Sequence, residues 1–290
     1  MRNGIGFAVA LTNNTTNQAM ITLFIILTTL LNLAPQQDMT LDPSNDFRGI
    51  GSAKTLSGKT YVLVLFVSQE GKSEWGKTEK TALMKKVKQA TGWISDKTRK
   101  FGKNNTFSVY SLGKKNDIKL KYIPQGPYER FNSNDVIRQA MIAAGYESTF
   151  DFFEYAQQKT SCNNCVVLVI SNTKGRSYAL PQSRDMYSRN IGSGCKPNQL
   201  EGCVLYSKYD NGQNIATPTI AHEILHLFGA NDLYGFKGDK QKDEKAAKHF
   251  PNSIMRRVNY SFDKLNIDPV TAYLTGLSDS LNEWYRQFTE

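Results

Sequence analysis

The stretch YVLVLFVS, residues 61–68, decides the fold. It is a continuous apolar run, which is typical of a strand buried on both faces of a helix-covered sheet. A second run, CVVLVIS at residues 165–171, has the same character, and CVLYS at residues 203–207 is a shorter one. We therefore expect these three segments to be strands in the core.

Helical and strand patterns alternate around these runs. Apolar residues recur at helical spacing over residues 83–101, and Gly102 is a natural helix end. A second helical region spans about residues 134–158, with a break at Gly145. Two alternating segments are predicted as further strands: TFSVYSL (106–112) and IKLKYI (118–123). This order predicts an α/β fold with a mixed, mostly parallel sheet and covering helices.

The N-terminal part contains an uncharged, largely apolar stretch, MITLFIILTTLLNLA, at residues 20–34. It is shorter than the roughly 20 residues that a membrane-spanning helix needs, and it suits the hydrophobic region of a secretory signal. The only basic side chain before it is Arg2, so either translation starts at Met20 or the segment stays as an uncleaved anchor. Residues 1–34 are thus predicted as a signal peptide or signal anchor, residues 35–59 as a linker or short pro-region, and residues 60–290 as one extracytoplasmic domain.

The composition is that of a globular protein with a basic surface. Lys and Arg number 36 against 26 Asp and Glu, which gives a net charge of +10. The basic residues are scattered, with KKVK at residues 85–88 and the pair Arg256 and Arg257 as the densest places, and no nucleic-acid-binding motif accompanies them. We therefore expect a solvated basic surface and no nucleic-acid partner.

Four cysteines agree with export to an oxidising compartment. An even count suggests two disulfides, and four cysteines allow three pairings. The local pairs Cys162–Cys165 and Cys195–Cys203 are favoured. The C-x-x-C of the first pair lacks the second C-x-x-C or the βαβ context of a zinc or redox motif, so a structural role is expected.

The stretch TPTIAHEILHLFGANDLYG, residues 217–235, carries the chemistry. Thr217 as the N-cap and Pro218 in the first turn predict a helix start. His222 and His226 are four residues apart, so both imidazoles project from one side of this helix and can reach one zinc ion. Glu223 stands beside the first histidine, where the glutamate of an H-E-x-x-H motif acts as general base.

A catalytic zinc ion takes a third protein ligand and leaves one position open for water. Gly229 can end the helix and turn the chain back, and Asp232 follows it, so Asp232 is the favoured third ligand. The rivals are His249 and Glu244. Glu244 lies 18 residues past His226, close to the spacing of thermolysin-like enzymes, but its surroundings are highly charged.

The pattern H-E-x-x-H-x-x-G-x-x-D at residues 222–232 resembles the metzincin signature, with aspartate where most members have histidine. Its continuation, Asp232-Leu233-Tyr234, is similar to secreted bacterial peptidases of the snapalysin and immune-inhibitor-A kinds. Ser253-Ile254-Met255 resembles the methionine turn of that family. LNIDPVTAYLTGL at residues 265–277 matches its C-terminal helix. The resemblance covers residues 217–277, about a fifth of the chain.

The resemblance implies a zincin-like domain with an active-site helix, one catalytic Zn²⁺ and a protein or peptide substrate. It implies that Met255 lies beneath the metal and that GRSYALP, residues 175–181, is the edge strand that pairs with extended substrate. Tyr260 would hydrogen-bond the oxyanion, although its spacing from Met255 departs from the family, and Tyr234 is interpreted as a packing residue. The family's cysteine-switch propeptide is absent, since no cysteine precedes Cys162.

The function predicted from the sequence is therefore that of a secreted zinc endopeptidase. Three alternatives stay open. One is a catalytically silent zincin-like domain that binds a partner, against which the intact Glu223 argues. Another is a peptidase that uses Glu244 as its third ligand. The last is a zincin that acts on a non-proteinaceous amide. A membrane is expected to be involved only through an uncleaved N-terminal segment.

Overall fold

Strand β1 (Gly58–Gln69) runs through the middle of a six-stranded sheet. The structure is a computed structural model that describes residues 49–72, 74–113, 115–124, 133–181, 201–257 and 259–289. The remaining strands are β2 (Asn105–Leu112), β3 (Ile118–Leu120), β4 (Asn164–Lys174), β5 (Tyr178–Leu180) and β6 (Gly202–Lys208). Their order is β2-β1-β4-β6-β5, with β3 also paired to β1. Only β5 is antiparallel to its neighbour, so the prediction of a mixed, mostly parallel sheet is confirmed.

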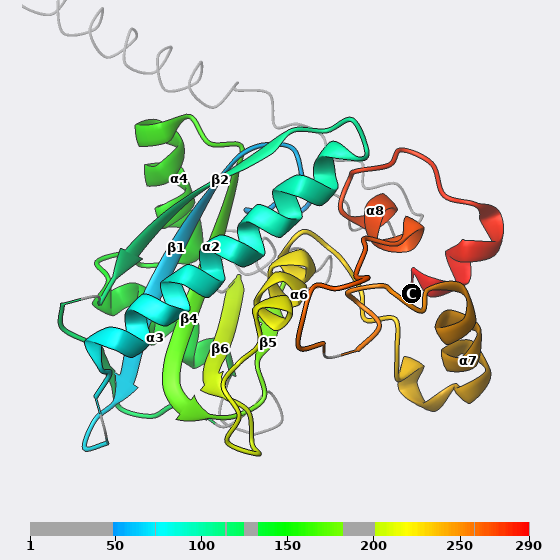
Figure 1. The fold of residues 1–290 in the computed structure, drawn as a ribbon. Helices are drawn as coiled ribbons and strands as arrows, with labels where there is room; N and C mark the ends of the chain where they lie inside the picture. The colour runs from blue at the N-terminus through cyan, green and yellow to red at the C-terminus, as the bar shows by residue number, and fades with distance from the viewer. Residues whose placement is uncertain are drawn as a thin grey trace, which may run out of the picture. The chain divides into compact units, whose positions relative to one another are not determined.

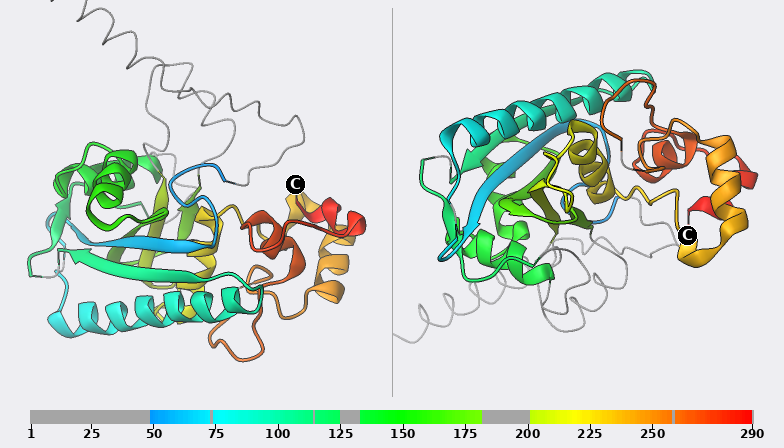
Figure 2. Two further views of the ribbon diagram at one scale, coloured as in Figure 1. Left: turned by 90° about the horizontal axis from the view of Figure 1, so that it is seen from above. Right: turned by 60° about the horizontal axis from the view of Figure 1, so that its bottom comes forward.

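Helices cover both faces of this sheet (Figures 1 and 2). Helices α2 (Lys77–Arg99) and α6 (Thr217–Leu227) pack on one face, and α3 (Ser133–Ala143) and α4 (Thr149–Thr160) pack on the other. Successive side chains of a strand point to opposite faces of the sheet, so alternate residues of β1 contact the two layers of helices. Val62, Val64 and Phe66 face α2 and α6, whereas the residues between them face α3 and α4.

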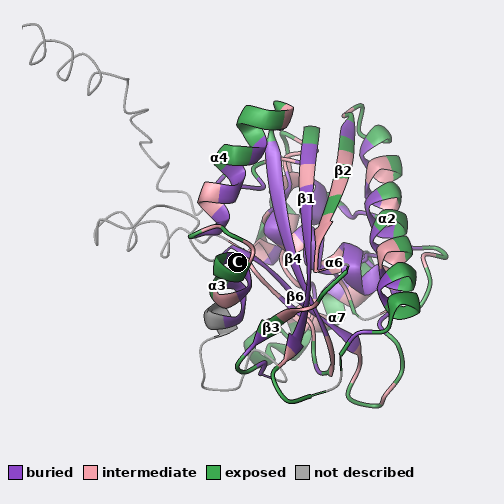
Figure 3. Ribbon diagram, turned by 90° about the vertical axis from the view of Figure 1, so that its left-hand side faces the viewer, coloured by how far each residue is buried: buried purple, intermediate pink, exposed green. Residues whose placement is uncertain are grey.

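Burial follows from this two-sided cover. Strands β1 and β4 are buried along most of their length, whereas α2 exposes its outer face (Figure 3). The apolar runs at residues 61–68 and 165–171 are therefore the central strands of the sheet, as their composition predicts. Burying apolar side chains at about 25 cal/mol per Å² is what holds the layers together.

The two alternating segments after α2 do not pair with each other. Both β2 and β3 lie beside β1 and run parallel to it, β2 along Gly58–Leu65 and β3 at Val67–Gln69. Gly113 ends the stretch of β2 with φ of +74°, and a Cβ atom there would lie 2.6 Å from the carbonyl oxygen of Phe66. Only glycine fits at this position, because both the conformation and the close approach exclude a side chain.

The helical expectations hold with shifted boundaries. The helix expected at residues 83–101 begins six residues earlier, and the region expected at 134–158 is divided into α3 and α4 around Gly145, whose φ is +89°. After α6 come η1 (Phe236–Gly238), α7 (Lys240–His249), α8 (Pro269–Leu274) and η2 (Glu283–Phe288). The C-terminal helix begins after Asp268, as predicted from Asp268 and Pro269, and Asp268 caps it through the amides of Val270 and Thr271. It ends at Leu274, before Gly276, whose φ is +73°.

Residues 49–57 belong to the fold and do not form a linker. Ile50, Ala53 and Leu56 are buried, and the amide of Leu56 donates to the carbonyl of Thr275. Residues 1–48, which include the predicted signal, lie outside the described residues. Within the described residues, none of the helices has the length and apolar character needed to cross a bilayer.

The cysteines behave differently from the prediction. Cys162 and Cys165 are buried free thiols, so the expected bond between them is not formed in the structure. Cys203 is also a buried free thiol, and its Sγ lies 3.2 Å from the carbonyl oxygen of Glu223. Cys195, its predicted partner, lies outside the described residues.

Candidate metal centre

Helix α6 presents the two histidines because its opposite face is fixed in the core. It packs against α2 and against strands β5 and β6. Its fully buried side chains include Ile220, Ala221, Ile224 and Leu225. The helix begins one residue earlier than expected, with Ala216 as the N-cap and without a side-chain cap, while Pro218 lies in the first turn as predicted. With the apolar face fixed, His222 and His226 project from the remaining side.

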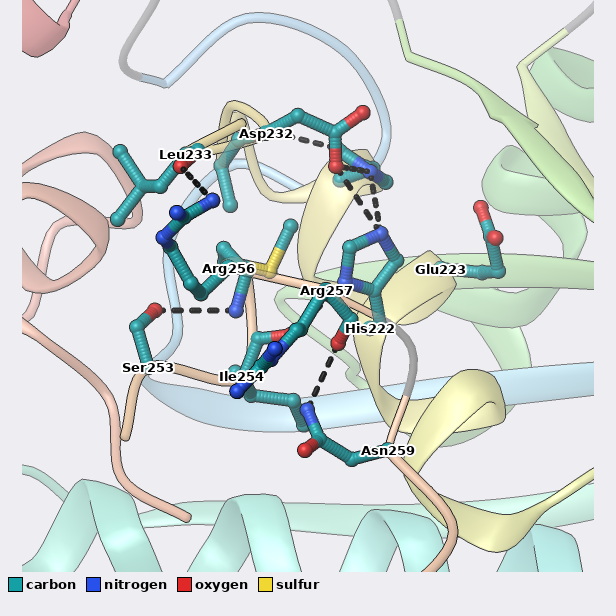
Figure 4. Close-up of polar contacts among 12 residues, drawn as sticks. His222, Glu223, Asp232, Leu233, Ser253, Ile254, Arg256, Arg257 and Asn259 are labelled. Atoms are coloured by element: carbon teal, nitrogen blue, oxygen red, sulfur yellow. Dashed lines mark hydrogen bonds and ion pairs between the residues drawn. The ribbon is translucent and has the colours of Figure 1, made fainter. Parts of the chain in front are cut away.

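Three ligand atoms meet beside this helix (Figure 4). Nε2 of His222 and Nε2 of His226 are 3.0 Å apart. Oδ1 of Asp232 lies 3.2 Å from the first nitrogen and 3.3 Å from the second. No other described group of three or more His, Cys, Asp or Glu side chains converges in this way.

The backbone determines which nitrogen of each ring is available. Nδ1 of His222 lies 3.0 Å from the carbonyl oxygen of Ile254, and Nδ1 of His226 lies 2.7 Å from that of Ala230. A carbonyl oxygen can only accept, so both Nδ1 atoms donate. In the neutral ring, Nε2 then carries a lone pair. This is the arrangement that orients metal-binding histidines.

These atoms fit a tetrahedral zinc site. Bonds of 2.0–2.1 Å at tetrahedral angles place neighbouring ligand atoms about 3.3 Å apart. The three distances of 3.0, 3.2 and 3.3 Å come close to that value. Two lone pairs and a carboxylate oxygen at this separation repel one another unless a positive charge lies between them, and Oδ1 of Asp232 is buried without a hydrogen-bond donor. The donor set therefore matches a divalent cation.

The turn after α6 brings Asp232 to the histidines. Gly229 has φ of +95°, a conformation that reverses the chain at little cost only for glycine. The amide of Leu233 then donates to the carbonyl oxygen of Met255 at 2.8 Å. This bond fixes the residue next to Asp232, so the chain reversal predicted from Gly229 is confirmed.

The segment containing Met255 supports the site from below. Met255 is fully buried, and its amide donates to Oγ of Ser253 at 3.0 Å. Oγ of Ser253 in turn donates to Oδ2 of Asp268, the cap of α8, at 2.6 Å. The turn at Ser253–Met255 thus holds both His222, through the Ile254 carbonyl, and the loop of Asp232. That this turn is the methionine turn of the family stays a prediction.

Glu223 is buried at the floor of the site. Burial raises the pKa of its carboxyl, and the two neighbouring histidines offset this in part. The carboxyl groups of Glu223 and Asp232 lie on different sides of the His222 ring (Figure 4). A carboxylate with a raised pKa beside three candidate metal ligands is suited to take up a proton.

The site attracts positive charge. Burial lowers the pKa of His226, but the close contact with the Asp232 carboxylate and the charge of Glu223 outweigh it and raise the pKa to about 9. The pKa of Asp232 is correspondingly lowered: burial opposes this, and the contacts to both histidines prevail. The field that favours a proton between these groups also favours a metal cation.

The site opens into a cavity of about 580 Å³. Its walls include residues of the β4–β5 segment, α6 and the segment after the Met255 turn, among them Arg176, Tyr178, Tyr234, Arg257 and Asn259. Tyr234 therefore faces the site and is more than the packing residue that the sequence suggested. Tyr260 does not line the cavity: it is 65% exposed and its ring packs against Tyr209. The predicted oxyanion role fits Tyr234 better than Tyr260.

The rival third ligands lie elsewhere. Glu244 is exposed on α7, and the ring of His249, at the end of that helix, packs against Trp284 in a tilted arrangement, with ring centroids 4.4 Å apart. Neither belongs to the group of converging ligand atoms. Sequence reasoning missed Arg176 and Arg257 as cavity residues, because nothing in their local pattern marks them.

Comparison with protein-family models gives no match for this chain, and no curated protein matches it.

Proposed function

We propose that this protein is a zinc-dependent endopeptidase that acts outside the cytosol. The observation that carries the proposal is the triangle formed by the Nε2 atoms of His222 and His226 and Oδ1 of Asp232, with Glu223 buried beside it. Two imidazoles and one carboxylate leave a fourth position open, as in catalytic rather than structural zinc sites.

The reaction follows from the roles of the side chains. Bound zinc would supply a Lewis acid that polarises the scissile carbonyl and lowers the pKa of the attacking water to about 7. Glu223 accepts the proton of this water and then passes it to the leaving amine. Tyr234 lines the same cavity and donates a hydrogen bond to the developing oxyanion. Burial raises the pKa of Tyr234 to about 12, so its hydroxyl keeps its proton at neutral pH.

An edge strand supports a peptide as the substrate. Among the strands that the structure describes, β5 is the last in the strand order, and it pairs with β6 over Tyr178–Leu180. Tyr178 and Ala179 also line the cavity. An extended peptide added to such an edge gains main-chain hydrogen bonds and is carried past the metal ligands.

The test measures metal content and cleavage together. The purified full chain should contain about one zinc per molecule and cleave casein, and a chelator should abolish the cleavage. Glu223→Gln should keep its zinc and lose at least about 100-fold in activity, since general-base catalysis is worth 10²–10⁴-fold. Glu244→Gln, an exposed carboxyl on α7, is the matched control and should stay active. A protein that binds no zinc under saturating supply, or an active Glu223→Gln variant, contradicts the proposal.

A further inference from the structure

Arg257 is a cation of the cavity wall without an ionic partner. It is exposed, and it makes neither an ion pair nor a side-chain hydrogen bond with any residue that the structure describes. Its neighbour Arg256 differs, because the Arg256 guanidinium contacts Asp243 at 3.2 Å and the carbonyl oxygen of Leu233 at 3.3 Å. Arg256 therefore stabilises the loop around Leu233 and Asp243, whereas Arg257 lines the cavity.

The other charged groups of the cavity are already engaged or lie at its rim. Arg176 interacts with the hydroxyl of Tyr234. Asp232 belongs to the ligand triangle, and Glu223 is the buried base beside it. Asp210 is exposed and forms no ion pair with Arg257. A substrate anion that enters the cavity therefore finds Arg257 available.

The backbone around Arg257 is hydrogen-bonded close to the candidate ligands. Nδ2 of Asn259 donates to the carbonyl oxygen of Arg257 at 2.7 Å (Figure 4). Three residues earlier, the carbonyl oxygen of Ile254 accepts from Nδ1 of His222. Arg257 therefore lies in a short segment with a backbone hydrogen bond near each end, one of them to the His222 ring, and this segment forms part of the cavity wall.

We propose that Arg257 selects substrates with a carboxylate close to the scissile bond. This inference rests on the proposed function and adds the substrate class. The planar guanidinium binds a carboxylate through two parallel N–H···O bonds, which gives geometric selectivity as well as charge. The carboxylate comes either from an acidic side chain flanking the scissile bond or from the C-terminus of the substrate.

The test compares matched peptides. A site that the protein cleaves in casein, mapped by mass spectrometry, supplies a neutral scaffold with blocked ends. Three versions carry Glu, Gln or Lys on either side of the scissile bond, and a fourth is the Gln peptide with a free C-terminal carboxylate. For an arginine at an exposed wall, we expect kcat/KM for the Glu peptide or the free-carboxylate peptide to exceed that for the Gln peptide about 5- to 10-fold. Which of the two peptides is preferred identifies the source of the carboxylate.

Variants assign the preference to Arg257. The ratio of kcat/KM for the preferred carboxylate peptide to kcat/KM for the Gln peptide should fall to about 1 in Arg257→Gln and keep part of its value in Arg257→Lys. In Arg257→Glu, kcat/KM should be highest for the Lys peptide. Arg138→Gln is the matched control, because Arg138 is an exposed arginine of α3 on the opposite face of the sheet. Its ratio should equal that of the wild type. Because the pair is partly exposed, 1 M salt should reduce the wild-type ratio.

Failure of this inference differs from failure of the proposed function. Equal cleavage of the Glu, Gln and free-carboxylate peptides by the wild type, or a ratio kept in Arg257→Gln, overturns the role of Arg257 and leaves the peptidase intact. If casein itself is not cleaved, the proposed function fails and no mapped site is available. In that case, binding of fluorescein-labelled, end-blocked model peptides with a central Glu, Gln or Lys to the wild type and to Arg257→Gln is measured by anisotropy. A dissociation constant for the Glu peptide that is no lower than that for the Gln peptide, or a ratio kept in Arg257→Gln, overturns the role of Arg257.

Discussion

The carbonyl oxygen of Ile254 lies 3.0 Å from Nδ1 of His222, a residue 32 positions earlier in the chain. This bond sets the tautomer of the His222 ring and directs Nε2 towards the second histidine and Asp232. One residue further on, the carbonyl of Met255 receives the amide of Leu233. A single buried turn therefore orients two of the three ligand-bearing segments, and its integrity should control metal affinity.

Removal of the third ligand should weaken zinc binding. Asp232→Ala deletes the one carboxylate of the triangle, and we expect the zinc dissociation constant to rise by more than about 100-fold, the upper end of what loss of an outer-shell partner costs. Competition with a fluorescent chelator measures it. Glu244→Ala and His249→Ala are the controls and should bind zinc as the wild type does, since both side chains lie away from the triangle. Normal zinc affinity in Asp232→Ala would show that another group is the third ligand.

The support beneath the metal should depend on Ser253. Ser253→Ala leaves the amide of Met255 and the carboxylate of Asp268 each without one buried partner, which costs about 1–3 kcal/mol in the free energy of unfolding. Zinc affinity should fall as well, by up to about tenfold. Urea unfolding and chelator competition give the two values. Ser261→Ala removes a similar but exposed bond to Asp263 and should change neither quantity measurably.

The glycine after α6 should resist substitution. At φ of +95°, Gly229→Ala places a side chain in the left-handed region, at a cost of about 1–2 kcal/mol. The strain acts on the carbonyl of Ala230, which holds Nδ1 of His226, so zinc affinity should drop together with stability. Gly92→Ala is the opposite case. Gly92 lies inside α2 with open space around it, and alanine there should stabilise the fold by about 0.5–1 kcal/mol. Equal thermal stability of the two variants would contradict this prediction.

Stability should fall as the pH rises from 4.5 to 7. Burial raises the pKa of Glu201 to about 7, and its hydrogen bonds from Ser52 offset this only in part. The folded-state pKa lies above the unfolded value of 4.5, so over this range the unfolded chain loses the proton first and unfolding becomes easier. The cost of ionising the buried Glu201 carboxyl is absent below pH 4.5 and complete above pH 7. A shift of this size in its pKa lowers the free energy of unfolding by about 3 kcal/mol.

Glu201→Gln tests this linkage. The variant should be more stable than the wild type at pH 8 and no more stable at pH 4.5, as measured by urea unfolding at both values. Glu244→Gln, at an exposed position, should show no such dependence on pH. A constant difference between Glu201→Gln and wild type across the range would mean that Glu201 titrates normally.

The local pattern was sufficient for the elements and for the first two ligands. Continuous apolar runs identified the central strands, and the spacing of His222 and His226 placed both rings on one side of a helix, because a helix repeats every 3.6 residues whatever surrounds it. The pairing of the strands could not be predicted in this way. The two alternating segments at residues 106–112 and 118–123 gave no sign that both lie parallel to β1, since register depends on a partner far away in the chain.

The sequence by itself determined the α/β class, the helix with two histidines and a glutamate, and the glycine that turns the chain back towards Asp232. Only the tertiary structure brought Asp232, and neither Glu244 nor His249, beside the two histidines, placed Tyr234 and Arg257 at the cavity in place of Tyr260, and packed residues 49–57 into the domain. The physical reason is the separation along the chain of the residues that interact. Helical spacing and a positive φ are properties of neighbouring residues, whereas a ligand triangle 3.0–3.3 Å on a side depends on hydrogen bonds such as that from Leu233 to Met255, which form only when distant segments have packed.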